Sequence, residues 1–248
     1  MRADRDVDRP ASRSDPGAAV SGRARVPLAA SAGDPRAAQK NLPEHVRGQR
    51  EFLDNEWKPK LDAAIAGSGH VLFVDAAHFV YGTFLCCLWS IVRIFVRAAS
   101  GRQRFNVLGA WNAVTRELIT ITNTTVVNTD TMCELLRAVA SRGWIGPVTM
   151  VLDNARYQRN AVVQGLAAEL EIVLLFLPSY SPNLNLIERL WRFMKRKAAY
   201  GRYHPTFADF RAAIQDVLDR VPTTHANKLA SLMTLNFQEF DEVSLLAA

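Results

Sequence analysis

Three acidic residues in this sequence have types and positions suited to binding metal ions. Asp75 ends the stretch VLFVD, Asp153 ends VTMVLD, and Glu188 lies in SYSPNLNLIERLW, a segment with helical spacing. Hard divalent cations prefer oxygen ligands, and two such ions roughly 3.5–4 Å apart stabilise the attacking and the leaving oxygen of an in-line phosphoryl displacement. The three residues therefore predict a magnesium-dependent enzyme that cuts phosphodiester bonds.

The interval between the second and the third acid leaves room for the elements that must bring them together. Thirty-four residues separate Asp153 from Glu188. They predict a helix over 156–171, a strand over 172–177 and a loop over 178–185 that returns the chain toward the first two acids. We therefore expect the three carboxylates to meet although they lie far apart in the sequence.

The rest of the chain supplies the other strands and helices of a mixed sheet. A first strand is predicted at 71–76, and strands at 104–113 and 117–124, joined at Val114–Arg116, complete a meander of three. The order βββαβαβα with a further helix, and acids at the ends of the first and fourth strands, predict an α/β, ribonuclease H-like fold. Its core would be a mixed five-stranded sheet flanked by helices. The remaining predicted elements are a strand at 148–153 and helices at 131–141, 186–199 and 207–220.

Composition divides the chain into three regions. Residues 1–42 contain no Phe, Trp, Tyr or Ile, so they cannot bury enough apolar surface to offset their ordering entropy, and we expect a disordered leader. Residues 43–222 form the predicted main domain, which opens with a lead-in helix over 44–66 that Pro59 should kink. Residues 223–248 are predicted to be a C-terminal tail.

Charge and cysteine content exclude several classes of protein. The 30 Lys and Arg against 24 Asp and Glu give a net charge of +6, which favours a polyanionic partner. Three cysteines without a CxxC pair support neither a disulfide framework nor a thiolate zinc site, and they favour a reducing cytoplasm. The longest apolar run, 79–92, has 14 residues, fewer than the ~18 of a membrane-spanning helix. No targeting signal is recognised.

Three sequence blocks resemble the catalytic domain of DDE transposases, in the bacterial insertion-sequence-630-type branch of the mariner superfamily. The blocks are VLFVDAAHFV, VTMVLDNARYQ and LPSYSPNLNLIERLWRFMKRK, and the resemblance covers roughly residues 45–222. It implies that Asp75, Asp153 and Glu188 are catalytic and hold two Mg²⁺ ions, for which Mn²⁺ can substitute. It also implies cleavage at transposon ends, strand transfer into target DNA, double-stranded DNA as the partner, a homodimer, and a nucleoid-associated location in a bacterial cytoplasm.

The sequence departs from that family in several places. Ala76 stands where many relatives have a glutamate directly after the first aspartate, and Asn185 stands between two leucines where the usual motif is Leu-Asn-Pro. Relatives also carry helix-turn-helix modules ahead of the catalytic domain, which residues 1–42 do not resemble. The departures are consistent with a truncated copy. An inactive DNA-binding remnant and a metal-dependent nuclease or resolvase on the same fold stay open as alternatives.

Residues near the acids are candidates for supporting roles, each with an ordinary structural alternative. Asn154 could orient a metal ligand or shape the turn after Asp153. His78 could act beside the metals or pack at the strand end, and Glu188 could instead close a capping box with Asn185. The cations that follow Glu188 predict phosphate contacts, with a solvated helix face as the alternative. These cations are Arg189, Arg192, Lys195, Arg196 and Lys197.

Two other enzyme classes lack a required sequence feature. A haloacid-dehalogenase-type phosphatase needs a second aspartate two residues after the first, where this chain has Ala77. A dinucleotide-binding fold needs a glycine-rich turn after its first strand, and none follows Asp75. Phosphodiester chemistry therefore remains the leading interpretation of the sequence.

Overall fold

The computed structural model describes residues 42–82, 103–179 and 181–237. The chain divides into residues 1–40 and 41–248, and all described residues belong to the second unit. The predicted disordered leader and most of the apolar run at 79–92 lie outside the described residues. Of the helices that are described, none has the length and apolar character needed to cross a membrane.

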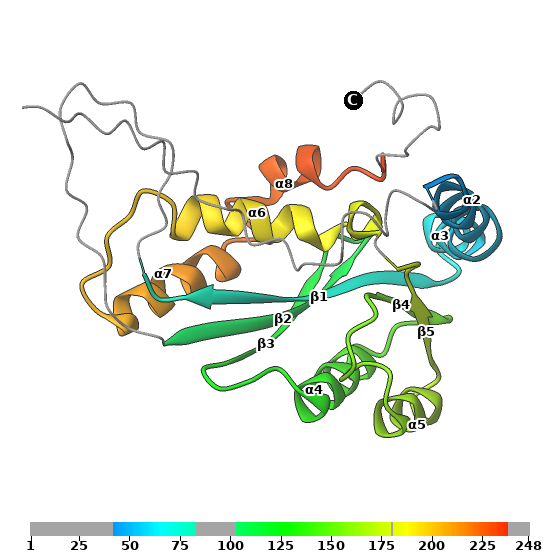
Figure 1. The fold of residues 1–248 in the computed structure, drawn as a ribbon, viewed down its shortest axis with the longest axis horizontal. Helices are drawn as coiled ribbons and strands as arrows, with labels where there is room; N and C mark the ends of the chain where they lie inside the picture. The colour runs from blue at the N-terminus through cyan, green and yellow to red at the C-terminus, as the bar shows by residue number, and fades with distance from the viewer. Residues whose placement is uncertain (1–41, 83–102, 180, 238–248) are drawn as a thin grey trace, which may run out of the picture. The chain divides into compact units, whose positions relative to one another are not determined.

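A five-stranded mixed sheet forms the centre of the second unit (Figure 1). The strands lie side by side in the order β3-β2-β1-β4-β5. β1 pairs antiparallel with β2 and β2 with β3, whereas β1 and β4, and β4 and β5, are parallel. The predicted mixed five-stranded sheet is therefore confirmed. Its strands are β1 (His70–Val80), β2 (Arg104–Asn112), β3 (Leu118–Asn123), β4 (Val148–Leu152) and β5 (Ile172–Phe176).

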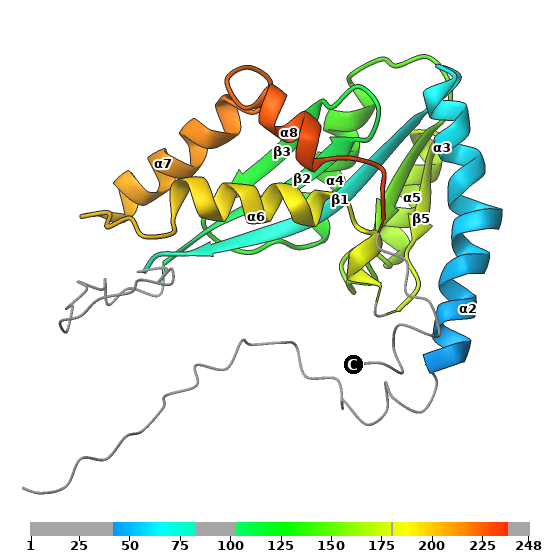
Figure 2. The same ribbon diagram turned by 90° about the horizontal axis from the view of Figure 1, so that it is seen from above.

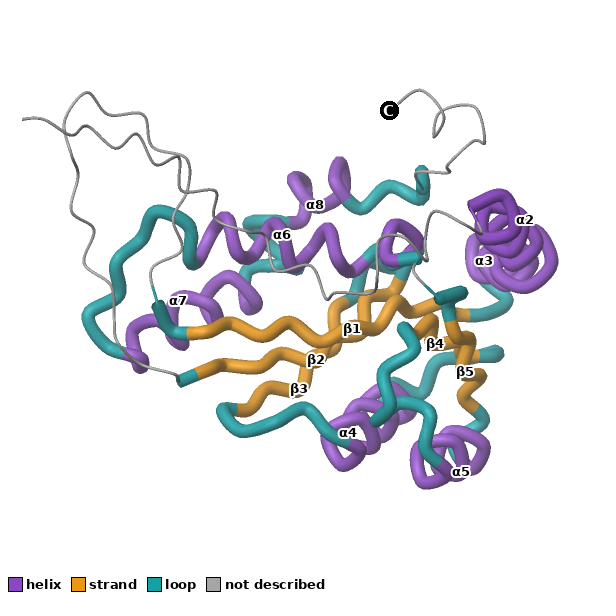
Figure 3. The backbone as a smooth tube through the Cα atoms, in the orientation of Figure 1, coloured by secondary structure: helices purple, strands orange, loops and turns teal. Residues whose placement is uncertain are grey.

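Helices cover both faces of this sheet, with α4 and α5 on one face and α6, α7 and α8 on the other (Figure 3). Asn128, Asn160 and Thr206 begin α4, α5 and α7 by accepting hydrogen bonds from backbone N–H groups of the first turn. These N–H groups have no partner inside a helix, so the caps define where each helix starts. The bounds are α4 (Thr129–Ala140), α5 (Ala161–Glu169), α6 (Ile187–Ala198), α7 (Phe207–Asp219) and α8 (Ala226–Leu232).

Side chains of β1 alternate between two hydrophobic clusters. Val71, Phe73 and Ala77 pack in the cluster that contains α6, α7 and α8, whereas Leu72 and Val74 pack in the cluster that contains α4 and α5. Successive side chains of a strand point to opposite faces of the sheet. On β1, odd-numbered residues therefore face α6, and even-numbered residues face α4.

The lead-in segment forms one rod of three helical pieces, seen lengthwise in Figure 2. They are α2 (Leu42–Phe52), a π-helical turn (Leu53–Trp57) and α3 (Lys58–Ile65). Pro59 lies in the first turn of α3, and it has no N–H to donate to the preceding turn, so the regular hydrogen-bond ladder is interrupted there. The predicted break at Pro59 is confirmed, and it takes the form of a widened turn just before the proline.

Two boundaries differ from the sequence prediction. β1 continues to Val80 rather than ending near residue 76, because Ala77 and Phe79 are buried in the core. α5 begins at Ala161 rather than at 156, because the Asn160 side chain accepts a hydrogen bond from the first turn and residues 156–159 form a turn. In both cases a tertiary contact or a cap, and not the hydrophobic pattern, decides the end of the element.

The predicted C-terminal tail contains a helix that packs on the domain. α8 lies within residues 223–248, and Leu229 and Met233 are buried in the cluster with α6. The aromatic ring of Phe237 also packs edge-on against Trp57, with 4.9 Å between the ring centroids. This part of the tail therefore belongs to the folded core.

Candidate active site

The register of the sheet places Asp75 and Asp153 side by side. β1 and β4 are parallel, with Phe73 paired to Val151. Asp75 lies two residues beyond Phe73, and Asp153 directly follows β4, two residues beyond Val151. Because side chains alternate along a strand, both carboxylates belong to the face of the sheet that carries α6.

Gly109 allows α6 to approach Asp75. It lies directly opposite Asp75 on β2, and a Cβ atom there would lie 2.7 Å from Cη2 of Trp191 and 3.1 Å from Cδ1 of Ile187. The Trp191 ring therefore occupies the space that a side chain at position 109 would fill. Glu188 precedes Trp191 by nearly one helical turn, so this close contact also sets the position of Glu188 relative to Asp75.

Replacement of Gly109 by alanine is expected to lower the free energy of unfolding by about 1–3 kcal/mol, the usual cost of overpacking a core. The Trp191 ring is only 2% exposed, so it has no room to retreat from the new methyl group. Urea denaturation measures the change. Gly165→Ala on α5 is the matched control, because nothing lies within 4 Å of a Cβ atom there. Equal losses of stability in both variants would contradict the role given to Gly109.

The loop before α6 is fastened to β1 and to α2. Asn185, which is 5% exposed, donates from Nδ2 to the carbonyl oxygen of Val74 at 3.2 Å. Gln49 on α2 donates from Nε2 to Oγ of Ser181 at 2.8 Å. α6 begins without a side-chain cap, so the alternative in which Glu188 closes a capping box with Asn185 is not formed. The exposed Glu188 carboxylate is therefore available for another role.

The Asp75 carboxyl group lies in surroundings that oppose its charge. Burial, and to a smaller extent the charges of Glu188 and Asp153, raise its pKa from an ordinary value of 3.8 to about 7. The backbone N–H of Ala76 and the indole of Trp191 lower the same pKa by smaller amounts. The carboxyl groups at the end of β4 and on α6 therefore lie close enough to Asp75 to oppose its ionisation.

The indole N–H of Trp191 is a polar group that the site leaves unsatisfied. It is buried and has no hydrogen-bond partner of normal geometry, although its proximity to Asp75 lowers the pKa of that carboxyl group. An ionised carboxylate only accepts hydrogen bonds, so Trp191 is placed to donate to Asp75 after a small shift. Neither Trp191 nor Gly109 was among the predicted site residues, because a glycine opposite an aspartate is visible only once the strand register is known.

Tyr157 is a second group near the acids that was not among the predicted site residues. Burial raises the pKa of its hydroxyl group, and the charges of Asp153 and Asp75 raise it further. Gln158 donates from Nε2 to the Tyr157 oxygen at 3.3 Å. Because the hydroxyl stays protonated at neutral pH, Tyr157 can donate a hydrogen bond to an anionic oxygen in this site.

The chemistry of the acidic group fits a divalent cation. Carboxylate oxygens are the ligands that Mg²⁺ and Mn²⁺ prefer, and a bound cation would relieve the repulsion that raises the pKa of Asp75. Within the described ranges, no three His, Cys, Asp or Glu side chains stand close enough together to hold one ion as they lie. The assignment of Asp75, Asp153 and Glu188 as catalytic metal ligands therefore stays a prediction.

Asn154 fastens the turn that carries Asp153. Its Nδ2 donates to the carbonyl oxygen of Leu177 at 2.7 Å, just after β5, and its Oδ1 accepts a hydrogen bond from Arg159. The Asp153 carboxylate itself accepts from the backbone N–H of Ala155 at 3.3 Å. These contacts agree with an orienting role for Asn154, which stays a prediction.

His78 lies on the opposite face of β1 from Asp75. The two residues are separated by an odd number of positions, so their side chains point away from each other across the sheet. Nδ1 of His78 lies 2.8 Å from Oδ1 of Asn106, whose Nδ2 donates to Oδ1 of Asn123 at 2.8 Å. The expectation that His78 supports the metal site is therefore corrected, because the ring takes part in a polar network on the α4 face.

The Arg189 side chain forms hydrogen bonds within the protein and is not part of the exposed face of α6. Its guanidinium group donates to the carbonyl oxygens of Leu232 at 3.3 Å, Thr234 at 2.7 Å and Asn236 at 2.6 Å. These bonds hold the segment that follows α8 against the start of α6. The prediction that Arg189 contacts phosphate is therefore corrected, because its donors are engaged within the chain.

The other four predicted cations lie on the same helix. Arg192, Arg196 and Lys197 are exposed, and Lys195 is partly buried. None of the four forms a salt bridge with any residue in the described part of the chain. Their charges are therefore available to a ligand, and their contact with DNA stays a prediction.

Comparison with known sequences identifies one family. Residues 92–211 match the family described as DDE superfamily endonuclease. The matched range contains Asp153 and Glu188 and begins after Asp75. No curated protein sequence matches the chain.

Several solved structures have a similar fold. A Mos1 transposase paired-end complex with the left transposon end has a TM-score of 0.54 at 14% identity, over 82% of this chain and 67% of that chain. A Mos1 mariner paired-end complex with Mn has a TM-score of 0.51 at 13% identity, over 84% of this chain and 65% of that chain. The Mos1 strand transfer complex has a TM-score of 0.53 at 16% identity, over 71% of this chain and 52% of that chain.

The structural likeness, at these low identities, concerns the fold alone. It confirms the predicted ribonuclease H-like architecture, which the sheet order and the flanking helices share with those chains. The chain spans from 52% to 67% of the length of the three structures.

Proposed function

We propose that this chain is the catalytic domain of a DDE transposase, which cleaves DNA and transfers the cut strand with the help of two divalent metal ions. The observation that carries the proposal is that the charges of Glu188 on α6 and Asp153 at the end of β4 both raise the pKa of the buried Asp75 on β1. The family match over residues 92–211 and the shared fold support it. The proposal includes three finer points: the chain belongs to the insertion-sequence-630-type branch, it moves an insertion sequence, and it acts at the nucleoid of a bacterial cell.

The chain's own residues would hold the reacting groups in place. Bound Mg²⁺ or Mn²⁺ ions would supply an activated water and neutralise charge on the phosphate. Trp191 is placed to orient the Asp75 carboxylate, Asn154 fastens the turn after β4, and Asn185 fastens the start of α6 to β1. Such support keeps a nucleophile and a phosphate in line, which supplies a large share of the rate of phosphoryl transfer.

Cations of α6 are the proposed contacts to the DNA backbone. Arg192 and Arg196 are four residues apart and therefore lie on one side of the helix. Lys195 and Lys197 extend the positive charge in its last turn. Phosphate contacts of this kind bind DNA of any sequence and weaken as salt rises. One Mos1 structure is a paired-end complex with a transposon end, which supports double-stranded DNA as the partner and a homodimer as the assembly.

The test is an assay of purified protein with supercoiled plasmid DNA and labelled oligonucleotides that carry a free 3′-hydroxyl end. We expect nicking of the plasmid and joining of the oligonucleotides to it, both dependent on Mg²⁺ or Mn²⁺. Nicking without joining would favour the alternative of a nuclease on the same fold. Salt-dependent DNA binding without metal-dependent cleavage would favour an inactive DNA-binding remnant and reject the enzyme.

A further inference from the structure

The loop between α6 and α7, residues 199–206, is fixed at several points. The hydroxyl of Tyr81, which follows β1, donates to the carbonyl oxygens of His204 and Pro205, each at 2.9 Å. Nε2 of His204 lies 2.8 Å from the carbonyl oxygen of Ala198, and its ring packs edge-on against Phe210 of α7. Contacts with three separate elements therefore define the conformation of this loop.

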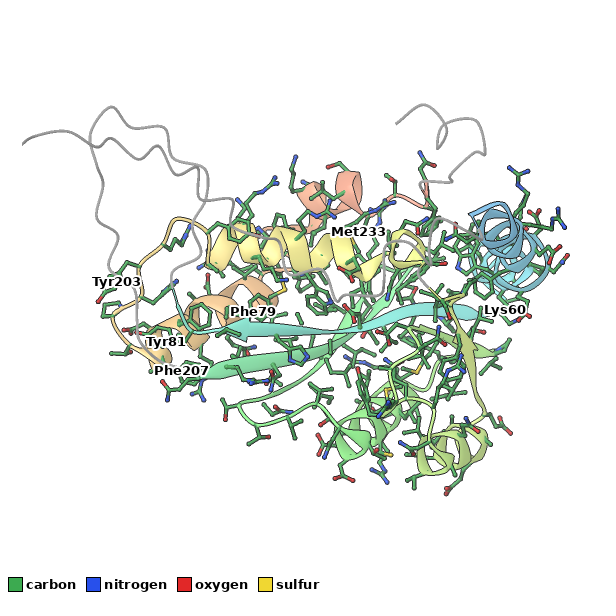
Figure 4. The ribbon with its side chains drawn as sticks, viewed as in Figure 1. Lys60, Phe79, Tyr81, Tyr203, Phe207 and Met233 are labelled. Carbon is green, nitrogen blue, oxygen red and sulfur yellow. The ribbon has the colours of Figure 1, made fainter. Side chains whose placement is uncertain are left out.

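Tyr203 is the more exposed of the two aromatic residues that this fixed loop presents to solvent, since Tyr200 is 38% exposed. Tyr203 is 52% exposed, and it lies at the same end of the molecule as Tyr81 and Phe207 (Figure 4). Burial raises the pKa of the Tyr81 hydroxyl, and Tyr203 lies close enough to raise it further. Its neighbour Arg202 is also exposed. The carboxylate of Asp209, in the first turn of α7, accepts hydrogen bonds from the cap of that helix. An ordered, exposed ring beside a cation is the combination that stacks on bases and neutralises phosphates.

Exposed cations connect the acidic site with Tyr203. Tyr81, which anchors the loop, lies six residues beyond Asp75, about 20 Å along an extended chain. α6 runs beside β1 over the same stretch, with Arg192 and Arg196 exposed on it (Figures 1 and 2). A DNA strand that leaves the acids and follows α6 would reach the loop after about six nucleotides, at a rise of roughly 3.4 Å each.

We infer that Tyr203 stacks on an unpaired base of the DNA strand held at the acidic site, with Arg202 contacting a neighbouring phosphate. The inference rests on the proposed function, which supplies DNA as the ligand. Every base offers a π-face to an aromatic ring, but in an intact duplex the neighbouring base pairs cover both faces. The site therefore takes single-stranded or frayed DNA in preference to an intact duplex, and it does so without regard to base sequence.

The experiment measures binding in EDTA, so that cleavage plays no part. Fluorescence anisotropy compares a single strand of about 12 nucleotides with the corresponding blunt duplex, within the usual site sizes of single-strand binders. Tyr203→Ala should weaken single-strand binding about fivefold or more, Tyr203→Phe should restore it, and duplex binding should change far less. Ile145→Ala is the matched control, because Ile145 is 90% exposed and lies just before β4, toward the opposite end of β1.

Two further measurements separate stacking from charge. The fluorescence of 2-aminopurine in the single strand should be quenched by wild-type protein and by Tyr203→Phe, but not by Tyr203→Ala. Arg202→Gln should lower the salt dependence of binding, whereas Arg137→Gln, an exposed cation of α4 on the other face of the sheet, should not. Equal losses of single-strand and duplex affinity in Tyr203→Ala, or no loss at all, would overturn the inference. If the wild-type protein quenches the fluorescence but does not cleave DNA, the inference that Tyr203 stacks on a base is retained and the proposed enzymatic function is rejected.

Discussion

Exchange of Asp153 for asparagine is expected to slow metal-dependent DNA cleavage by at least about a thousandfold. The amide lacks the charge that binds a hard cation, and a loss on the order of 4 kcal/mol of transition-state stabilisation corresponds to this factor. The fold should persist, because the asparagine oxygen can still accept the hydrogen bond from the backbone N–H of Ala155. Single-turnover kinetics with Mn²⁺ on labelled DNA measures the rate.

Asp62→Asn provides the control for this exchange, since it removes the same charge from an exposed position on α3. It should cleave at the wild-type rate. Titration calorimetry adds a readout that does not depend on cleavage, because Asp153→Asn should lose the uptake of Mn²⁺ that Asp62→Asn retains. A fully active Asp153→Asn protein would remove Asp153 from the metal site and with it the proposed chemistry.

Asp75 is expected to make the metal-free protein less stable as the pH rises from about 4 to about 7. Its folded-state pKa of about 7 lies above its ordinary value of 3.8, so in this window the folded chain binds a proton that the unfolded chain has lost. The stabilising contribution is fully present below the unfolded pKa and is lost as the pH rises through the folded pKa. This rise in the pKa of Asp75 corresponds to roughly 4 kcal/mol.

Asp75→Asn isolates this contribution, because the amide does not titrate. Urea denaturation in EDTA measures the free energy of unfolding at pH 4.5 and at pH 8. Between these two pH values, the free energy of unfolding of the variant should increase by a few kcal/mol relative to that of the wild type. Addition of Mn²⁺ at pH 8 should stabilise the wild type, by about 2.7 kcal/mol at a hundredfold excess over the dissociation constant, and leave the variant unchanged. If the free energy of unfolding changes with pH in the same way in both proteins, then Asp75 is not a buried carboxyl group near negative charges.

Most elements of the fold could be predicted because their signals are local. The aromatic and aliphatic residues of 104–112 predict β2, and the β-branched run of 148–152 predicts β4. α6 was expected over 186–199 and spans Ile187–Ala198, since its apolar stripe repeats at helical spacing. Pro59 marks the break in the lead-in helix by its missing N–H. Each of these features depends on residues within a turn or two of one another.

Elements that depend on distant partners were predicted less well. β1 extends to Val80 because β2 pairs with it as far as Arg104, a contact that no pattern within β1 records. The same extension puts His78 on the face opposite Asp75, so its predicted role near the metals is lost. α8 forms a packed helix within the predicted tail because Leu229 is buried in the hydrophobic cluster that contains α6.

The candidate site divides in the same way. The sequence by itself determined which strands carry the first two acids, which helix carries the third, and the order of the elements between them, because strand and helix periods are local properties of a chain. Asp153 follows the end of β4 as predicted, whereas Asp75 lies in the middle of β1 rather than at its end. Only the tertiary structure decided that Asp75 faces Gly109, that Trp191 fills the space this glycine leaves, and that Arg189 is engaged by the C-terminal segment. Strand register and side-chain packing are selected by the free energy of the whole core, so no single segment contains the information.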